Sequence, residues 1–238
     1  MKYKAVLFDL DDTLTKSNKV YNKAMRVASD FLAEKFALDP EVFYSLALEK
    51  YTIVAKNFPT IHTRHSRILL FRLALDEMAE KYDLSLLPDA EDLYWNYFME
   101  SIELYPGVID TLKQINDAGI KIAIVSDGSL SLRIRKTKAA GLLPYVDEIV
   151  ASEEVIFEKP FSAIFTLALN KLDINAEDAI MVGNNMKNDI RGAQLVGIKA
   201  GLFDPEVDGN VEGREDSIKP DFTLKTMPEL LVQLGLSN

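Results

Sequence analysis

Short apolar runs alternate with segments of helical periodicity along most of the chain. The first run, residues 5–8, stops at acidic residues, which is typical of a buried strand that ends at a site. Similar runs predict strands over residues 120–125, 148–151, 179–182 and 199–202 and near 221–223. Helical patterns separate them around residues 130–140, 162–172 and 190–196. This alternation predicts an α/β fold built of right-handed βαβ units, with a parallel sheet covered by helices.

The segment from Val20 to Ile102 interrupts this alternation. Its apolar residues recur at helical spacing, and no convincing strand lies among them. Asp39 and Pro40 are typical of a helix N-cap followed by proline at the first helical position. The pattern predicts four helices, with apolar residues at 20–31, 46–54, 68–82 and 93–98.

The chain is therefore expected to form two domains. Residues 1–14 and 103–238 would make the α/β domain, and residues 15–102 a helical insert after its first strand. The aromatic residues of the insert, Trp95 among them, are expected to pack in its core. Residues 204–219 are rich in acidic residues, glycine and proline, which predicts a surface loop.

Composition and charge narrow the class of protein and of partner. The chain has 238 residues, of which 48% are hydrophobic and 27% charged, as in soluble globular proteins. Its formal net charge is −10 and it has no long basic run, so nucleic acid is not an expected partner. The first apolar run is too short for a signal peptide, and no stretch approaches the ~18 apolar residues of a membrane span. We expect a cytoplasmic monomer or homodimer that does not act at a membrane.

The side chains that the sequence lacks restrict its chemistry further. With no cysteine, the chain has no disulfide, no thiolate nucleophile and no cysteine-bound metal. Its two histidines, His62 and His65, do not lie near the G-x-S-x-G turn of a serine hydrolase, and a zinc site built on them is not expected. Any catalysis is therefore expected to depend on carboxylates.

Residues suited to a binding or catalytic site follow the predicted strands. They are Asp9, Asp11, Thr13, Ser126, Asp127, Gly128, Gly183, Asn184, Asn185 and Asp189, with Lys159 in the segment after the third strand. Because ligands bind outside the carboxyl ends of parallel strands, we expect these residues to gather at one edge of the sheet. Taken singly, each has a structural explanation: a solvated turn for the acidic residues, a helix N-cap for Ser126 and a surface position for Lys159.

Four motifs follow one another along the chain. They are D-x-D-x-T at residues 9–13, an apolar strand ending in serine at 122–126, a lysine followed by proline at 159–160, and a segment at 183–189 that matches G-D-x-x-x-x-D except for asparagine at 184. In this order and spacing they resemble the motifs of haloacid dehalogenase (HAD) superfamily hydrolases of the phosphatase type. Residues 106–108 also resemble the segment by which such a chain re-enters its core from a cap. The resemblance implies a Rossmann-like three-layer core, with the helical insert as a cap domain.

The resemblance also implies a role for each matching residue. Asp9 would be the nucleophile and form an aspartyl-phosphate, while Asp11 would protonate the leaving group and then deprotonate water. Ser126 would hydrogen-bond a phosphoryl oxygen, and Lys159 would compensate the charge of the phosphate and of Asp9. Backbone N–H groups would complete the phosphate site, namely those of Leu10, Asp11 and Asp127.

A phosphate monoester needs its negative charge neutralised before an anion can attack it, and Mg²⁺ is the expected cofactor. The candidate ligands are Asp9, the backbone carbonyl of Asp11, Asn184 and Asp189. Asn184 departs from the family pattern, which usually has aspartate there, and an amide is a weaker, uncharged ligand. Either Asp189 supplies the second charge or the metal is bound less tightly.

The implied function is a Mg²⁺-dependent phosphatase that hydrolyses a small phosphorylated metabolite. A 2-haloacid dehalogenase-like hydrolase is a second interpretation, which Asp11 disfavours because halide leaves without a proton. A third is a catalytically weak HAD-like binding or regulatory protein, for which Asn184 is the only argument.

The insert would exclude water from the site and select the substrate. Its densest polar patch, residues 62–67, either recognises the leaving group or is an exposed loop and helix start.

Overall fold

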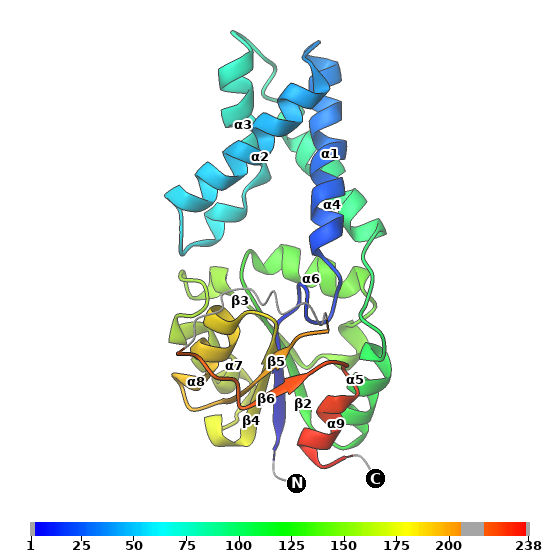
Figure 1. Cartoon of the computed structure of the whole chain (residues 1–238), viewed down its shortest axis with the longest axis vertical. Coiled ribbons are helices and arrows are strands. Elements are labelled where there is room, and N and C mark those ends of the chain that lie inside the picture. The colour runs from blue at the N-terminus through cyan, green and yellow to red at the C-terminus, as the bar shows by residue number, and fades with distance from the viewer. Residues whose placement is uncertain (1–2, 206–216, 237–238) are drawn as a thin grey trace. The chain divides into compact units, whose positions relative to one another are not determined.

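The computed structural model describes residues 3–205 and 217–236, which fall into two compact units (Figure 1). The core unit runs up to Lys16 and resumes at Glu103, and the helical unit spans Ser17–Ile102. Thr15 lies with the core because it is fully buried, donates its hydroxyl to the Leu10 carbonyl at 3.1 Å and bridges to Leu104. The core unit therefore extends two residues beyond the position expected from the sequence.

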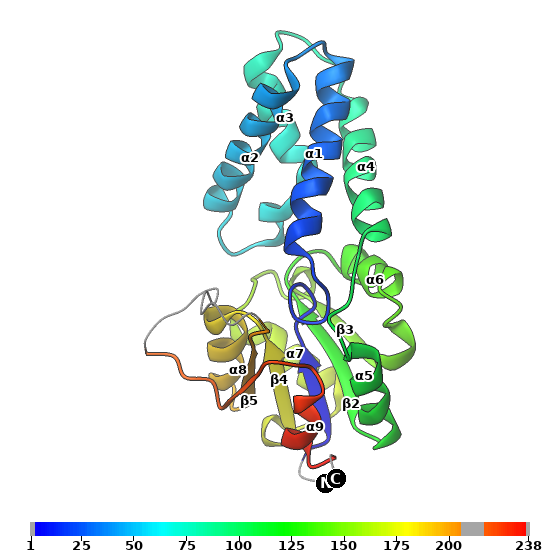
Figure 2. The same ribbon diagram turned by 45° about the vertical axis from the view of Figure 1, so that its right-hand side comes forward.

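Within the residues that the structure describes, six parallel strands form one sheet in the order β3-β2-β1-β4-β5-β6. The strands are β1 (Ala5–Phe8), β2 (Lys121–Ser126), β3 (Glu148–Ala151), β4 (Ala179–Gly183), β5 (Lys199–Phe203) and β6 (Phe222–Leu224). The predicted parallel sheet is confirmed, and each predicted strand is present within a residue or two. β1 lies in the middle, between β2 and β4 (Figure 2), so residues that follow it are flanked by the ends of both neighbours.

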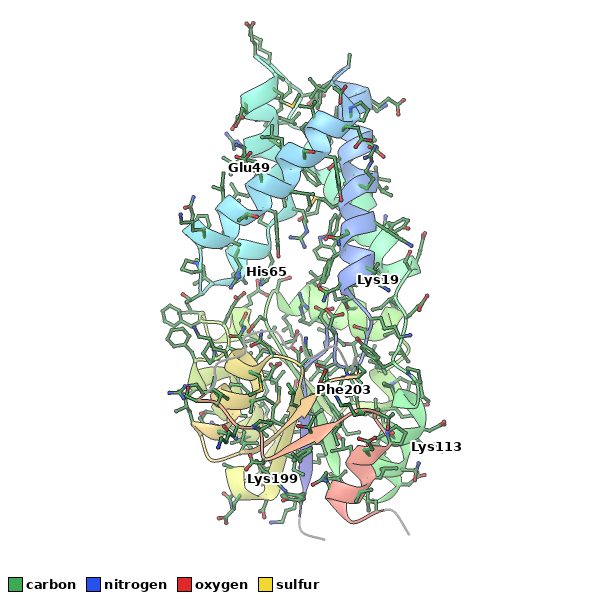
Figure 3. All side chains as sticks on the ribbon, in the orientation of Figure 1. Lys19, Glu49, His65, Lys113, Lys199 and Phe203 are labelled. Carbon is green, nitrogen blue, oxygen red and sulfur yellow. The ribbon has the colours of Figure 1, made fainter. Side chains whose placement is uncertain are left out.

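Alternate residues of the strands face two separate hydrophobic clusters. Val6 and Phe8 of β1 pack toward α5 (Val108–Asp117) and α9 (Glu229–Leu234), with Lys113 exposed on α5 (Figure 3). Ala5 and Leu7 pack toward α7 (Ser162–Leu172) on the opposite face. The three-layer α/β architecture is therefore confirmed.

The connections after β2 and β4 differ from each other in kind. An ordinary helix, α6 (Leu130–Ala139), follows β2. β4 instead leads into a π-helix (Met186–Arg191) and the short α8 (Gly192–Gln194), where the periodicity predicts a helix over 190–196. The side chain of Asn185 starts the π-helix by accepting hydrogen bonds from the N–H groups of Lys187 and Asn188. Most of the expected surface loop, residues 206–216, lies outside the described residues.

The helical unit contains the four expected helices: α1 (Asn18–Lys35), α2 (Pro40–Asn57), α3 (Arg67–Met78) and α4 (Leu86–Glu100). The Asp39 N-cap is confirmed, since its carboxylate accepts from the N–H groups of Glu41 and Val42, both at 2.9 Å. α3 stops at Met78, short of the predicted end at Tyr82.

The polar patch of the helical unit divides into two parts. Residues 62–65 form a 3₁₀ turn, and Ser66 caps α3. Arg67, which is 4% exposed, lies among the rings of Tyr21, Tyr51, Tyr94 and Trp95 at 4.6–5.8 Å. Trp95 packs in this core as predicted. Arg67 is therefore part of the core of the helical unit, and a substrate-recognition role for residues 62–67 stays a prediction.

Within residues 3–205 and 217–236, no helix is both long and apolar enough to cross a membrane. The expected cytoplasmic location stays a prediction.

Candidate active site

The turn after β1 holds the first group of candidate residues. The backbone N–H of Asp9 donates to the carbonyl of Val182 on β4, so the sheet continues to its last residue. The carbonyl of Leu10 then accepts the N–H groups of Leu14 and Thr15 and closes a tight turn. Asp12 sits in the left-handed region (φ 57°), which aspartate tolerates better than most residues. The carboxylates of Asp9 and Asp11 therefore project from a short, internally bonded loop.

Lys159 connects three segments of the core unit. Its ammonium donates to Oδ1 of Asp9 at 2.6 Å, to Oδ1 of Asp189 at 2.7 Å and to the carbonyl of Val125 at 3.0 Å. These contacts use all three donors of the ammonium. Its backbone N–H donates to the carboxylate of Asp127 at 2.8 Å. Lys159 is only 6% exposed, so its interpretation as one surface lysine among many is wrong.

Asp189 is held by both of its carboxylate oxygens. Oδ1 accepts from Lys159, and Oδ2 accepts from the N–H of Asn185 at 2.9 Å. Gly183 makes this fold-back possible, because a Cβ at that position would lie 2.4 Å from the carboxyl carbon of Asp189. The π-helix thus returns Asp189 to the end of β4, buried to 1% exposure.

Burial governs the electrostatics around Lys159. It raises the pKa of Asp9 to about 7 and that of Asp127 to about 6, against the opposing attraction of the ammonium. The pKa of Asp189 is raised for the same reason. Burial alone would lower the pKa of Lys159, but the three surrounding carboxylates raise it, so the lysine stays charged. One cation therefore neutralises a pocket that would otherwise hold several unpaired negative charges.

The other carboxylate oxygen of Asp9 faces neutral oxygen atoms. The Thr13 hydroxyl lies 3.4 Å from Oδ2 of Asp9 and 3.4 Å from Oδ1 of Asn184. In the part of the chain that the structure describes, no three acidic or histidine side chains gather closely enough to hold a metal by themselves. A cation here would be bound by one carboxylate and neutral oxygens, a donor set suited to Mg²⁺ with water or phosphate completing its shell.

Asp11 is bound by two cations that the sequence motifs did not indicate. Arg133 Nη1 donates to its Oδ2 at 2.6 Å, and the Lys136 ammonium lies 2.8 Å from both carboxylate oxygens. The same Nη1 lies 3.3 Å from Oγ of Ser126. Ser126 is the last residue of β2 and α6 is capped at Ser129, so the N-cap interpretation of Ser126 is wrong. The helix that follows β2 carries four basic residues, and their spacing alone does not show which of them contact Asp11.

The core unit thus brings Asp9, Lys159 and Asp189 into direct contact, with Thr13 and Asn184 beside them. Asp11 and Ser126 are joined through Arg133. The catalytic and metal-binding roles of these residues stay predictions, as do the phosphate contacts expected from the N–H groups of Leu10, Asp11 and Asp127.

Comparisons with known proteins agree with this geometry. The family model described as haloacid dehalogenase-like hydrolase matches residues 3–197. A ribulose-1,5-bisphosphate 5-phosphatase of Halopiger xanaduensis is 33% identical over 95% of this chain and 97% of its own. A glyceraldehyde 3-phosphate phosphatase of Methanopyrus kandleri is 32% identical over 96% and 95%. The crystal structure of a HAD phosphatase from Thermococcus onnurineus superposes with a TM-score of 0.74 at 26% identity and covers 98% of both chains. The chain therefore belongs to the haloacid dehalogenase-like hydrolases and is a hydrolase of the phosphatase type.

Proposed function

We propose that this protein is a Mg²⁺-dependent phosphatase that hydrolyses small phosphorylated metabolites through an aspartyl-phosphate on Asp9. The main support is the environment of that carboxylate. One oxygen is held by Lys159 at 2.6 Å, and the other lies 3.4 Å from the Thr13 hydroxyl, which in turn lies 3.4 Å from the amide oxygen of Asn184. A carboxylate fixed in this way at a strand end can attack in line, while a buried lysine offsets the charge of its target.

In the first step, a carboxylate oxygen of Asp9 attacks the phosphorus and the bond from phosphorus to the substrate oxygen breaks. The departing oxygen takes a proton from the carboxyl group of Asp11 and leaves as an alcohol. Ser126 donates a hydrogen bond to a phosphoryl oxygen. In the second step, water attacks the phosphorus and gives its proton to Asp11, and the bond from phosphorus to Asp9 breaks. The sum is phosphate ester plus water giving alcohol plus inorganic phosphate.

The residues present fit a Mg²⁺ ion. We assign Asp9, the carbonyl of Asp11 and Asn184 as its ligands. When bound, the ion would neutralise part of the negative charge on the phosphoryl group. Asp189 is better suited to holding Lys159 and the Asn185 loop, because both of its carboxylate oxygens already accept hydrogen bonds. The weaker ligand at Asn184 agrees with a site that depends on substrate phosphate and water to complete the coordination shell.

The named activities of the relatives indicate which substrates to test. The Halopiger and Methanopyrus proteins are named for ribulose-1,5-bisphosphate and glyceraldehyde 3-phosphate. Both are short phosphorylated sugars, and we propose the same class here.

The test is release of inorganic phosphate by the full chain from these two esters, with Mg²⁺ or with EDTA. Asp9→Asn keeps the size of the side chain but removes the nucleophilic oxygen, so we expect activity to fall by ~10³-fold or more. Asp117→Asn, an exposed change at the end of α5, is the matched control and should leave the rate unchanged.

Three results would overturn parts of this assignment. Full activity in Asp9→Asn would show that Asp9 is not the nucleophile, and full activity in EDTA would show that the reaction does not need the metal. Release of halide from a 2-haloacid, with none of phosphate from any ester, would favour the dehalogenase interpretation. A folded wild type that binds these esters without turnover would favour a binding protein.

A further inference from the structure

The carboxylate of Asp11 is held from one side by α6. Arg133 and Lys136 contact it at 2.6 and 2.8 Å, and both cations project from the same side of that helix, three residues apart. Because the two residues belong to one helix, they form a rigid support for a side chain that projects from a loop.

This ion cluster differs from the surface ion pairs of the chain. The side chains of Arg133 and Lys136 are 3% and 0% exposed, and the Asp11 side chain is 20% exposed. Burying a cation is costly unless a charged partner compensates it. The fold would therefore lose stability if the Asp11 carboxylate moved away from Arg133 and Lys136. An exposed lysine such as Lys4, whose side chain is 63% exposed beside Asp178, carries no comparable constraint.

Arg133 also contacts both Asp11 and Ser126. The same Nη1 atom lies 2.6 Å from the carboxylate and 3.3 Å from the serine Oγ. Gly128 leaves the space that the guanidinium occupies, since a Cβ there would lie 2.7 Å from Nη2. The guanidinium thus fixes the distance between the group proposed to move the proton and the hydroxyl proposed to bind the phosphoryl oxygen.

We propose that Arg133 and Lys136 are positioning residues, which hold the Asp11 carboxyl where it can reach the oxygen of the leaving group. This inference rests on the proposed function of Asp11. Proton transfer depends on alignment within hydrogen-bond reach, and a displacement of about 1 Å can cost ~10²-fold in rate. Neither cation needs to touch the substrate to have this effect.

The test compares two esters by kcat/KM, which covers the steps only up to departure of the alcohol or phenol. p-Nitrophenyl phosphate releases an anion that is stable without a proton, whereas glyceraldehyde 3-phosphate releases an alcohol that needs one. Arg133→Met and Lys136→Met keep the apolar length of each side chain and remove its charge. We expect ~10-fold or greater loss on the alkyl ester and less than about 3-fold loss on the aryl ester.

Controls separate positioning from a general structural effect. Arg135→Met and Lys138→Met remove exposed cations of the same helix and should change neither rate. If circular dichroism shows that Arg133→Met does not fold, Arg133→Lys is the substitute. It retains a cation that cannot reach both Asp11 and Ser126, and it should also lose more activity on the alkyl ester than on the aryl ester, by a smaller factor.

Asp11→Asn separates failure of the inference from failure of the proposed function. It should show the largest preference for the aryl ester. If it affects both esters equally, Asp11 is not the acid and the proposed function is wrong at that point. If Asp11→Asn discriminates but the Arg133 and Lys136 variants lose activity equally on both esters, the positioning role alone is overturned.

Discussion

Replacing Lys159 by methionine should destabilise the fold in a manner that depends on pH. The ammonium lies 2.6 Å from Asp9 and 2.7 Å from Asp189, and all three side chains are buried. Removing one partner of a buried ion pair typically costs about 3–5 kcal/mol, because the remaining charge is left without compensation. In Lys159→Met two carboxylates would face each other, so at pH 8 we expect a loss of stability of this size.

The loss should shrink as the pH falls. Without the lysine, the pKa of the remaining carboxyl groups rises further above the unfolded value, so the folded variant binds protons that its unfolded chain releases. Its stability therefore falls as pH rises, by at most about 1.4 kcal/mol per pH unit for each extra proton. Protonation of one carboxyl near pH 5 should recover part of the deficit.

The assay is equilibrium urea unfolding, followed by far-ultraviolet circular dichroism in EDTA. Fluorescence is unsuitable for this site, because the single tryptophan, Trp95, lies in the helical unit. Lys187→Met removes an exposed lysine of the π-helix and is the control. The double variant Lys159→Met with Asp189→Asn should be more stable than Lys159→Met alone. A deficit below about 1 kcal/mol, or one of equal size at pH 5 and pH 8, would refute this reasoning.

Three further predictions test other parts of the structure. Gly183→Ala places a methyl group 2.4 Å from the carboxyl carbon of Asp189, so it should lower the free energy of unfolding by about 1–3 kcal/mol and the phosphatase rate at least tenfold. Unchanged values would contradict the close approach of Asp189 to the end of β4. Burial raises the pKa of Asp127 to about 6, above the ~3.9 of an unfolded chain, so wild-type melting temperature should fall as pH rises from about 4 to 6. Asp127→Asn should make that decline shallower without abolishing it, because burial also raises the pKa of Asp9 and Asp189, and parallel melting curves for the two proteins would count against the shift. Arg67→Lys replaces the guanidinium that lies 5.3 Å from the Trp95 ring and should destabilise the helical unit by about 2 kcal/mol. The measurement is urea unfolding followed by tryptophan fluorescence. An unchanged midpoint would show that the ring contacts contribute nothing to stability.

The sequence predicted the elements whose signal is local. Apolar runs located the strands, and the rule that ligands bind at the carboxyl ends of parallel strands placed Asp9, Ser126 and Lys159 at one edge of the sheet. The same pattern distinguished the helical insert from the α/β domain, because the apolar residues of the insert recur at helical spacing with no strand between them. These features depend only on burial and backbone geometry near each residue.

The parts that the sequence did not predict depend on contacts between distant segments. α6 carries basic residues at 133, 135, 136 and 138, and nothing in their spacing shows which pair is buried against Asp11. The π-helix over 186–191, ahead of most of the expected helix, starts where the Asn185 side chain accepts the N–H groups of Lys187 and Asn188, and apolar periodicity does not record such contacts. Arg67 looked like part of an exposed polar patch until the surrounding rings were known.

The central place of β1 has a consequence for the order in which the protein is made. β1 is the first strand to leave the ribosome, yet its neighbours begin only at Lys121 and Ala179, after the entire helical unit. This fully buried strand must therefore wait, unpaired, until more than half of the chain has been synthesised, whereas all residues of the helical unit have been made by then. The contacts of Lys159 with Asp9 and Asp189 join segments that lie far apart in the sequence, so phosphatase activity in a growing or refolding chain should appear late in folding rather than early.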